Sequence, residues 1–127
     1  MTKKDKATIS KLSSVNRFML SVAADPRGYQ STEMTVRSFF RHYRDFCRNN
    51  ELKGCLNLQG FAGQLADFGI RGVVRDASLS FGMPDMSKLR ESLIADLGLS
   101  KRFFNDPESL EAAAGIRNAG IAGDFTL

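Results

Sequence analysis

The chain has 127 residues and a mass of 14.0 kDa, a size that fits one domain with one modest core and excludes a second large domain. Eighteen Lys and Arg residues against fourteen Asp and Glu give a net charge of +4, which is basic but identifies no partner by itself. No apolar run approaches the roughly 20 residues that a membrane span needs, and no apolar signal stretch follows the basic start. We therefore expect a cytoplasmic protein with no membrane partner.

The positive charge is concentrated in the first part of the chain. Residues 1–48 hold ten Lys or Arg against four acids, residues 49–83 hold three against three, and residues 84–127 hold five against seven. A basic part joined to a nearly neutral remainder is the pattern that a phosphate backbone or another acidic surface attracts. Ordinary solubilising charge is the alternative.

Residues 1–12 carry Lys3, Lys4 and Lys6 among small polar residues with few apolar partners. Little in this segment offsets the entropy cost of ordering it, so we expect a flexible basic arm. Such an arm could lie along nucleic acid, or it could be a frayed terminus.

Two amphipathic helices follow. Val15, Phe18, Met19 and Val22 have helical spacing behind Ser13 or Ser14 as the N-cap, and the turn 25–28 ends this helix at a proline. In the second helix Thr35 is the expected cap. Its apolar face holds Val36, Phe39, Phe40, Tyr43, Phe46 and Cys47.

The opposite face of the second helix carries Arg37, Arg41, Arg44 and Arg48, at positions i, i+4, i+7 and i+11. We call these four residues the arginine stripe. Like charges in a row repel one another unless solvent or an acidic partner offsets them. The stripe therefore indicates contact with a phosphate backbone or an acidic protein surface, or else a solvated face.

A third helix is predicted over 58–68, capped by Asn57 and ended by Gly69 in a left-handed conformation. Residues 54–56 form at most a short strand before it. Its exposed face would carry Gln59, Gly60, Gly63, Gln64 and Asp67. Because glycine costs about 1 kcal/mol in an exposed helix, the two glycines suggest close approach by another helix or by a ligand backbone.

The apolar period then falls from 3.6 to 2, which predicts a β-hairpin over 72–83 with Leu79, Phe81 and Met83 on one face. Ser87 is the expected cap of a helix that runs to Leu97. A last helical piece is expected near 107–114. The residues from 115 to 127 look irregular or mobile.

This order of elements predicts a mainly α fold with a small β-hairpin: a winged helix-turn-helix with additional C-terminal helices. We expect a basic flexible arm over 1–12, a winged-helix-like domain over 13–98, and a C-terminal helical extension with a mobile tail over 99–127.

Residues 15–83 resemble the winged-helix domain at the C-terminus of primase-helicase proteins of phages, plasmids and large DNA viruses. The matching positions are Val15 and Phe18, the segment 40–47, then Phe61, Leu65, Gly69 and Ile70, followed by the hairpin. The resemblance implies a DNA-binding module. Two features depart from that family: the helicase phosphate-loop motif is absent from the sequence, and residues 58–68 hold no Lys or Arg.

The sequence offers no enzyme chemistry. His42 lacks an identifiable triad or zinc partner, Cys47 lies on an apolar helix face, and Cys55 lies in a short loop. We expect no enzyme, no metal, no cofactor and no small-molecule substrate.

We therefore predict a small DNA-binding module that acts in replication or transcription control. Gln59 and Gln64 can pair with adenine, although plain solvent exposure explains them equally well. The alternative is a protein-interaction or structural adaptor, or a homo-oligomer, that binds an acidic partner through the stripe or a helix through Gly60 and Gly63. The predicted nucleic-acid contacts are Lys3, Lys4, Lys6, Arg37, Arg41, Arg44, Arg48, Gln59, Gln64, Arg71 and Arg75.

Overall fold

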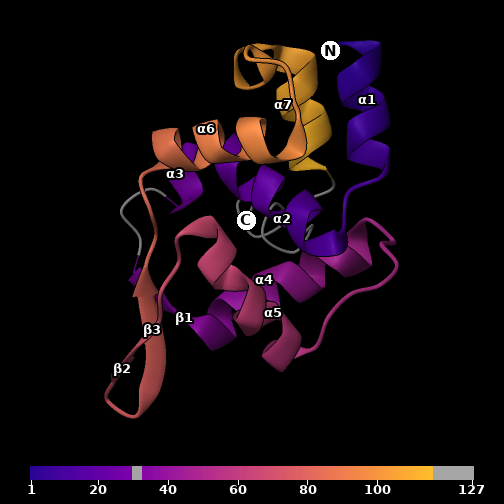
Figure 1. Ribbon diagram of the computed structural model, residues 1–127. Coiled ribbons are helices and arrows are strands. Elements are labelled where there is room, and N and C mark those ends of the chain that lie inside the picture. Colours follow the sequence, from indigo (N-terminus) through magenta and orange to yellow (C-terminus); the bar gives the residue numbers. More distant parts are fainter. Residues whose placement is uncertain (30–32, 116–127) are drawn as a thin grey trace, which may run out of the picture.

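The computed structural model describes residues 1–29 and 33–115. This part of the chain is mainly helical, as the sequence predicts, and carries one small three-stranded antiparallel sheet that includes the predicted hairpin (Figure 1). In chain order the elements are α1 (Lys3–Ser10), α2 (Ser14–Ala24), α3 (Pro26–Tyr29), β1 (Glu33–Thr35), α4 (Val36–Asn49), α5 (Leu58–Gln64), the 3-10 helix η1 (Leu65–Phe68), β2 (Val73–Arg75), β3 (Ser78–Gly82), α6 (Met86–Leu97), the 3-10 helix η2 (Phe103–Asn105) and α7 (Pro107–Ala114).

The sheet has the strand order β1-β3-β2. The predicted hairpin is confirmed as β2 and β3, joined by Asp76 and Ala77, whose φ angles of 49° and 65° are typical of a tight hairpin turn. Strand β1, in which Met34 pairs with Phe81, is not predicted by the sequence. The short strand considered at 54–56 does not form, because the edge of β3 pairs with β1 instead.

An aromatic cluster between α2, α4 and α5 forms the centre of the core. Tyr43 stacks on Phe61 with ring centroids 4.6 Å apart, and Phe18 lies edge-on to both rings. Tyr43, Phe61, Leu65 and Phe81 are buried. Phe40, which the helical spacing places on the apolar face of α4, is only partly buried, because it lies at the border of that face beside Arg44.

Local signals place most helix ends. Ser13, Thr35 and Asn57 each accept a hydrogen bond from a backbone N–H in the first turn of the following helix, as predicted. Gly69 ends η1 with a φ of 76°, as expected. At α6 the prediction is wrong: Asp85, not Ser87, is the cap, because its carboxylate accepts from two backbone N–H groups, of Ser87 and Lys88.

The first residues form a helix and not the loose arm that we expect from the sequence. Thr2 caps α1, and Asp5 is buried, where it accepts hydrogen bonds from the backbone N–H of Ser100 at 3.0 Å and from its hydroxyl at 2.6 Å. Ile9 also enters the core. These long-range contacts supply the stabilisation that the segment lacks by itself.

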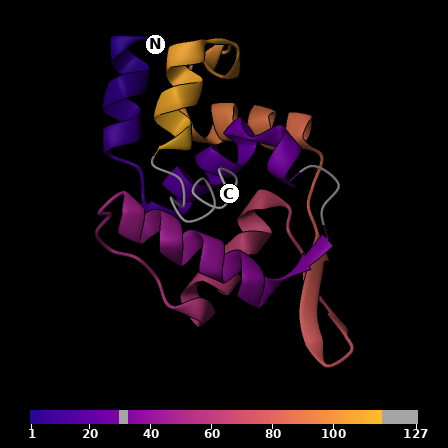
Figure 2. The same ribbon diagram turned by 180° about the vertical axis from the view of Figure 1, so that it is seen from behind.

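The C-terminal helices belong to the same core as the rest, so the boundary expected at residue 98 does not separate two packing units. Helix α7 packs on α2 and lies beside α1 (Figures 1 and 2). Leu99, Phe103 and Ala113 are buried in the common core. A short helix, α3, replaces the turn predicted at 25–28. The tail predicted to be mobile lies, after Gly115, outside the described residues.

Candidate nucleic-acid interface

All four members of the arginine stripe are exposed along α4. Arg48 is paired with Asp45 on the same helix, and the guanidinium of Arg44 lies 6.0 Å from the centre of the Phe40 ring. Within residues 1–29 and 33–115, Arg37, Arg41 and Arg44 have no ion-pair partner. These three residues of α4 therefore carry the charge that is available to an anionic partner.

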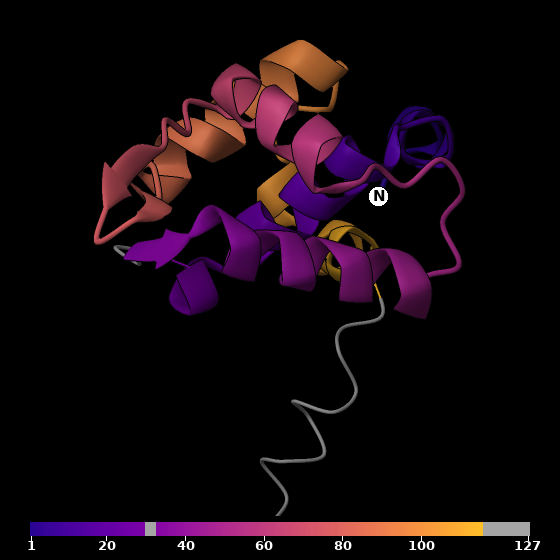
Figure 3. The ribbon, with the colours of Figure 1, turned by 90° about the horizontal axis from the view of Figure 1, so that it is seen from below.

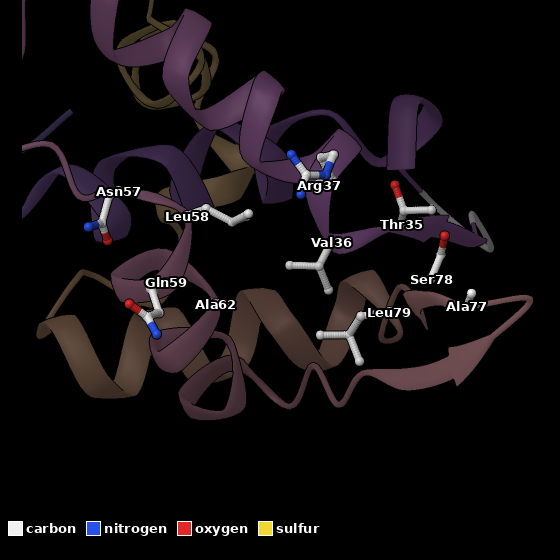
Figure 4. Close-up of a pocket in the computed structure, with 10 residues that line it drawn as sticks. All are labelled: Thr35, Val36, Arg37, Asn57, Leu58, Gln59, Ala62, Ala77, Ser78 and Leu79. Atoms are coloured by element: carbon white, nitrogen blue, oxygen red, sulfur yellow. The ribbon is translucent and has the colours of Figure 1, made fainter.

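A groove of about 670 Å³ opens beside Arg37, between the first turns of α4 and α5 and the hairpin (Figure 4). Its apolar surface comes from Val36, Leu58, Ala62 and Leu79. The lining residues are Thr35, Val36, Arg37, Asn57, Leu58, Gln59, Ala62, Ala77, Ser78 and Leu79.

The position of the groove follows from the link between β1 and α4. Thr35 is both the last residue of β1 and the N-cap of α4, since its hydroxyl accepts from the backbone N–H of Ser38 at 3.0 Å. Because β1 pairs with β3, the hairpin is fixed at the N-terminal end of α4. On the other side of the groove, Asn57 caps α5 and sets the direction of its first turn.

The groove brings together two predicted contact residues from different helices, Arg37 of α4 and Gln59 of α5. Gln64, at the other end of α5, is exposed and lies outside the groove lining. A cation and a neutral amide at one groove can contact a phosphate and a base edge respectively.

The hairpin supplies less charge than the sequence suggests. Arg71 is exposed just before β2, but Arg75 is paired with Glu33 of β1 at 2.8 Å. This ion pair across the sheet partly neutralises one of the two predicted hairpin cations.

Lys3, Lys4 and Lys6 are exposed on α1, which lies at the opposite end of the molecule from the hairpin in two views (Figures 1 and 3). The structure therefore does not bring these lysines to the groove. A nucleic acid would have to pass around the molecule to contact both the lysines of α1 and the groove.

No family model, curated protein or solved structure matches this chain. The geometry of the described residues is therefore the basis for assigning a function. In that part of the chain no helix is long and apolar enough to cross a bilayer, and no three or more His, Cys, Asp or Glu residues gather in a metal-binding arrangement.

Two titratable groups on α4, His42 and Cys47, make contacts within the protein. His42 Nδ1 lies 2.9 Å from the Tyr29 hydroxyl, and desolvation lowers the pKa of His42 against a smaller opposing effect of Asp45. His42 therefore adds little positive charge to α4 at neutral pH. Burial, together with contact with Cys55, raises the pKa of Cys47 to about 12, so that this thiol is a poor nucleophile.

Sequence reasoning missed the apolar lining of the groove. Val36 and Leu58 have the spacing of core residues, and Leu79 was expected to lie on the buried face of the hairpin with Phe81 and Met83. Leu79 is instead 44% exposed, while Phe81 and Met83 are buried. The sequence does not predict β1, and the pairing of β1 with β3 sets the position of the hairpin relative to the core.

The two glycines of α5 differ in their surroundings. A Cβ atom on Gly60 would lie 3.3 Å from the Leu56 Cβ, so this position is tight for reasons within the chain. A Cβ atom on Gly63 would meet nothing within 4 Å among the described residues. Only Gly63 therefore leaves open space for a partner.

Proposed function

We propose that the chain is a small, non-enzymatic DNA-binding module of the winged-helix type, of the kind that phage, plasmid or viral proteins use in replication or transcription control. The observation that carries the proposal is the meeting of Arg37 and Gln59 at one groove beside the hairpin. Helices α2, α4 and α5 followed by the hairpin support this proposal, with strand β1 before α4 and not before α5 as the sequence predicted.

In this proposal the stripe binds the phosphate backbone and α5 approaches the bases. Arg37 and Arg41 contact successive phosphates, while Gln59 reaches a base edge from the first turn of α5. The exposed residues of α5 and η1 include no cation and one acid, Asp67. Most of the affinity therefore comes from α4, and binding tolerates changes of DNA sequence.

The test is a titration of labelled, unrelated DNA duplexes at several salt concentrations. Changing Arg37 and Arg41 to Ala should weaken binding to all duplexes about equally and lower the slope of log affinity against log salt by close to two. The matched control changes Lys88 and Lys101, which are exposed on α6 and in the turn after it, and should leave the slope unchanged. Absence of DNA affinity for the wild type at ~150 mM salt would contradict the proposal.

A protein-interaction module is the second candidate, and the apolar lining of the groove favours it. In this case an acidic helix would contact the stripe or lie against Gly63. Replacing Gly63 with Ala should stabilise the free chain by up to about 1 kcal/mol, because alanine favours the helix more than glycine does and the added methyl group meets no described atom within 4 Å. Gly63→Leu should block such a partner, and the affinity for that partner should depend less on salt than DNA binding does.

A further inference from the structure

The hairpin carries a bare apolar surface. Among the described residues, the large hydrophobic side chains with substantial exposure are Val73 at 50%, Val74 at 75% and Leu79 at 44%, and all three lie in β2 or β3. Val74 is paired with Leu79 across the two strands, so these two side chains share one face of the sheet. Val73, next to Val74 in β2, points to the opposite face. Neighbouring exposed apolar side chains such as Val74 and Leu79 are typical of an interaction surface.

The charge at the tip of the hairpin is unfavourable for contact with phosphate. The Arg75 guanidinium is paired with Glu33 at 2.8 Å. The next residue, Asp76, is exposed in the turn and has no ion-pair partner in the described part of the chain. The tip therefore presents a free carboxylate next to exposed valines, which suits a cationic site with an apolar floor.

The same molecule carries such a site. The groove has Val36, Leu58 and Ala62 in its lining and Arg37 beside them. Because Ala77, Ser78 and Leu79 of the hairpin form one wall of this groove, the hairpin and the groove are neighbours. A two-fold rotation that places one hairpin over a second groove can place the second hairpin over the first, which gives a closed dimer with two equivalent contacts.

We propose that two copies of the chain associate in this way. The hairpin of each copy docks into the groove of the other, with Asp76 paired to Arg37 of the partner subunit and Val74 covering the apolar floor. This inference does not depend on the proposed function. The dimer covers Arg37 and Gln59, so self-association and nucleic-acid binding exclude one another at the groove.

The proposal is tested by reversing the charges of Arg37 and Asp76 and measuring the molecular mass by sedimentation equilibrium, without nucleic acid. The wild type should approach twice the 14.0 kDa chain mass at about 100 μM, a concentration at which micromolar association is nearly complete. Arg37→Glu alone and Asp76→Arg alone should each remain near the single-chain mass, because each self-pair brings like charges together twice. An equimolar mixture of the two variants should regain the double mass, since both contacts of the mixed pair then join opposite charges.

Three further variants separate this contact from general effects of charge and folding. Lys101→Glu makes the same charge change as Arg37→Glu at an exposed position in the turn after α6, and it should keep the wild-type mass. Asp76→Asn removes the charge but tolerates the positive φ of the turn, and it should weaken association. Val74→Ser should raise the dissociation constant at least about tenfold, because apolar contact is lost in both halves. Far-ultraviolet circular dichroism should show every variant folded.

Two results would overturn the proposal: a wild type of single-chain mass at about 100 μM, or a mixture of folded Arg37→Glu and Asp76→Arg variants that stays at single-chain mass. If the Val74→Ser variant loses DNA affinity but keeps the molecular mass of the wild type, the hairpin contacts nucleic acid and not a second copy of the chain. That outcome would end this proposal and leave the proposed DNA-binding function intact. Conversely, if the wild type is a dimer at about 100 μM but its single-chain form, at about 10 nM, has no DNA affinity, only the proposed function would end.

Discussion

The Tyr43 hydroxyl accepts a hydrogen bond from the backbone N–H of Leu56 at 2.8 Å, which ties the middle of α4 to the segment that leads into α5. The same hydroxyl lies 2.7 Å from Ser14 Oγ, and Ser14 in turn donates to the Gly54 carbonyl. With the Tyr43 ring stacked on Phe61, one side chain fixes α2, α4 and the approach to α5.

Replacing Tyr43 with Phe should lower the free energy of unfolding by about 1–3 kcal/mol, because the Leu56 N–H and the Ser14 hydroxyl each lose a partner inside the protein. Urea denaturation measures this change. Tyr29→Phe is the matched control, because it removes a hydroxyl whose bond to His42 is exposed, and its effect should be clearly smaller. Equal effects of the two changes would contradict this account of the core.

Phe61→Ala should lower the free energy of unfolding by about 3–5 kcal/mol, since the ring is fully buried against Tyr43 and Phe39. Such a loss is a large part of the stability of a domain of this size. Phe40→Ala should cost less, because Phe40 is only partly buried. A cost below roughly 1 kcal/mol for Phe61→Ala would mean that α5 faces the core with other residues.

The stability should also depend on His42 protonation. Desolvation lowers the pKa of His42 in the folded chain below the ordinary value of 6.5. Between the folded and unfolded pKa values the unfolded chain binds more protons, so the free energy of unfolding rises with pH in that window and falls as the pH drops below about 6.5. His42→Gln should therefore narrow the difference in Tm between about pH 7.5 and about pH 5.5. An unchanged difference would exclude this source of pH dependence.

The two cysteines should differ in reactivity toward a thiol reagent. Cys55 is exposed, whereas Cys47 is buried and its pKa is raised to about 12. The folded chain should therefore show one fast-reacting thiol, and a second should appear only in denaturant. Cys55→Ser should abolish the fast reaction. Two fast thiols in the folded wild type would show that the C-terminal end of α4 opens readily.

The sequence predicted those parts of the fold that depend on neighbouring residues. The caps at Thr35 and Asn57 and the left-handed Gly69 act within one turn. The hairpin follows from the alternation of apolar and polar residues in the segment 72–83. Strand β1 was missed because three residues have no periodicity of their own, and Met34 depends on Phe81, far along the chain.

The sequence predicted that Arg37 and Gln59 are exposed polar residues of the candidate site, but it did not predict the groove between them. The exposure of Arg37 and Gln59 follows from helical spacing alone. Their meeting at one groove depends on the β1–β3 pairing, which is a tertiary contact. The ion pair between Arg75 and Glu33 is equally non-local, so the low charge of the hairpin tip was not foreseen from the sequence.

The contact between Asp5 and Ser100 has a consequence for synthesis of the chain. A buried carboxylate in the first helix receives its two hydrogen bonds from a residue that the ribosome adds 95 positions later. Helix α2 packs on α4 within the first half of the chain, but the part of its surface that contacts α7 must wait likewise. That surface and the buried side of α1 therefore stay uncovered during most of translation, and we expect the nascent chain to depend on chaperone protection until residue 114 has emerged.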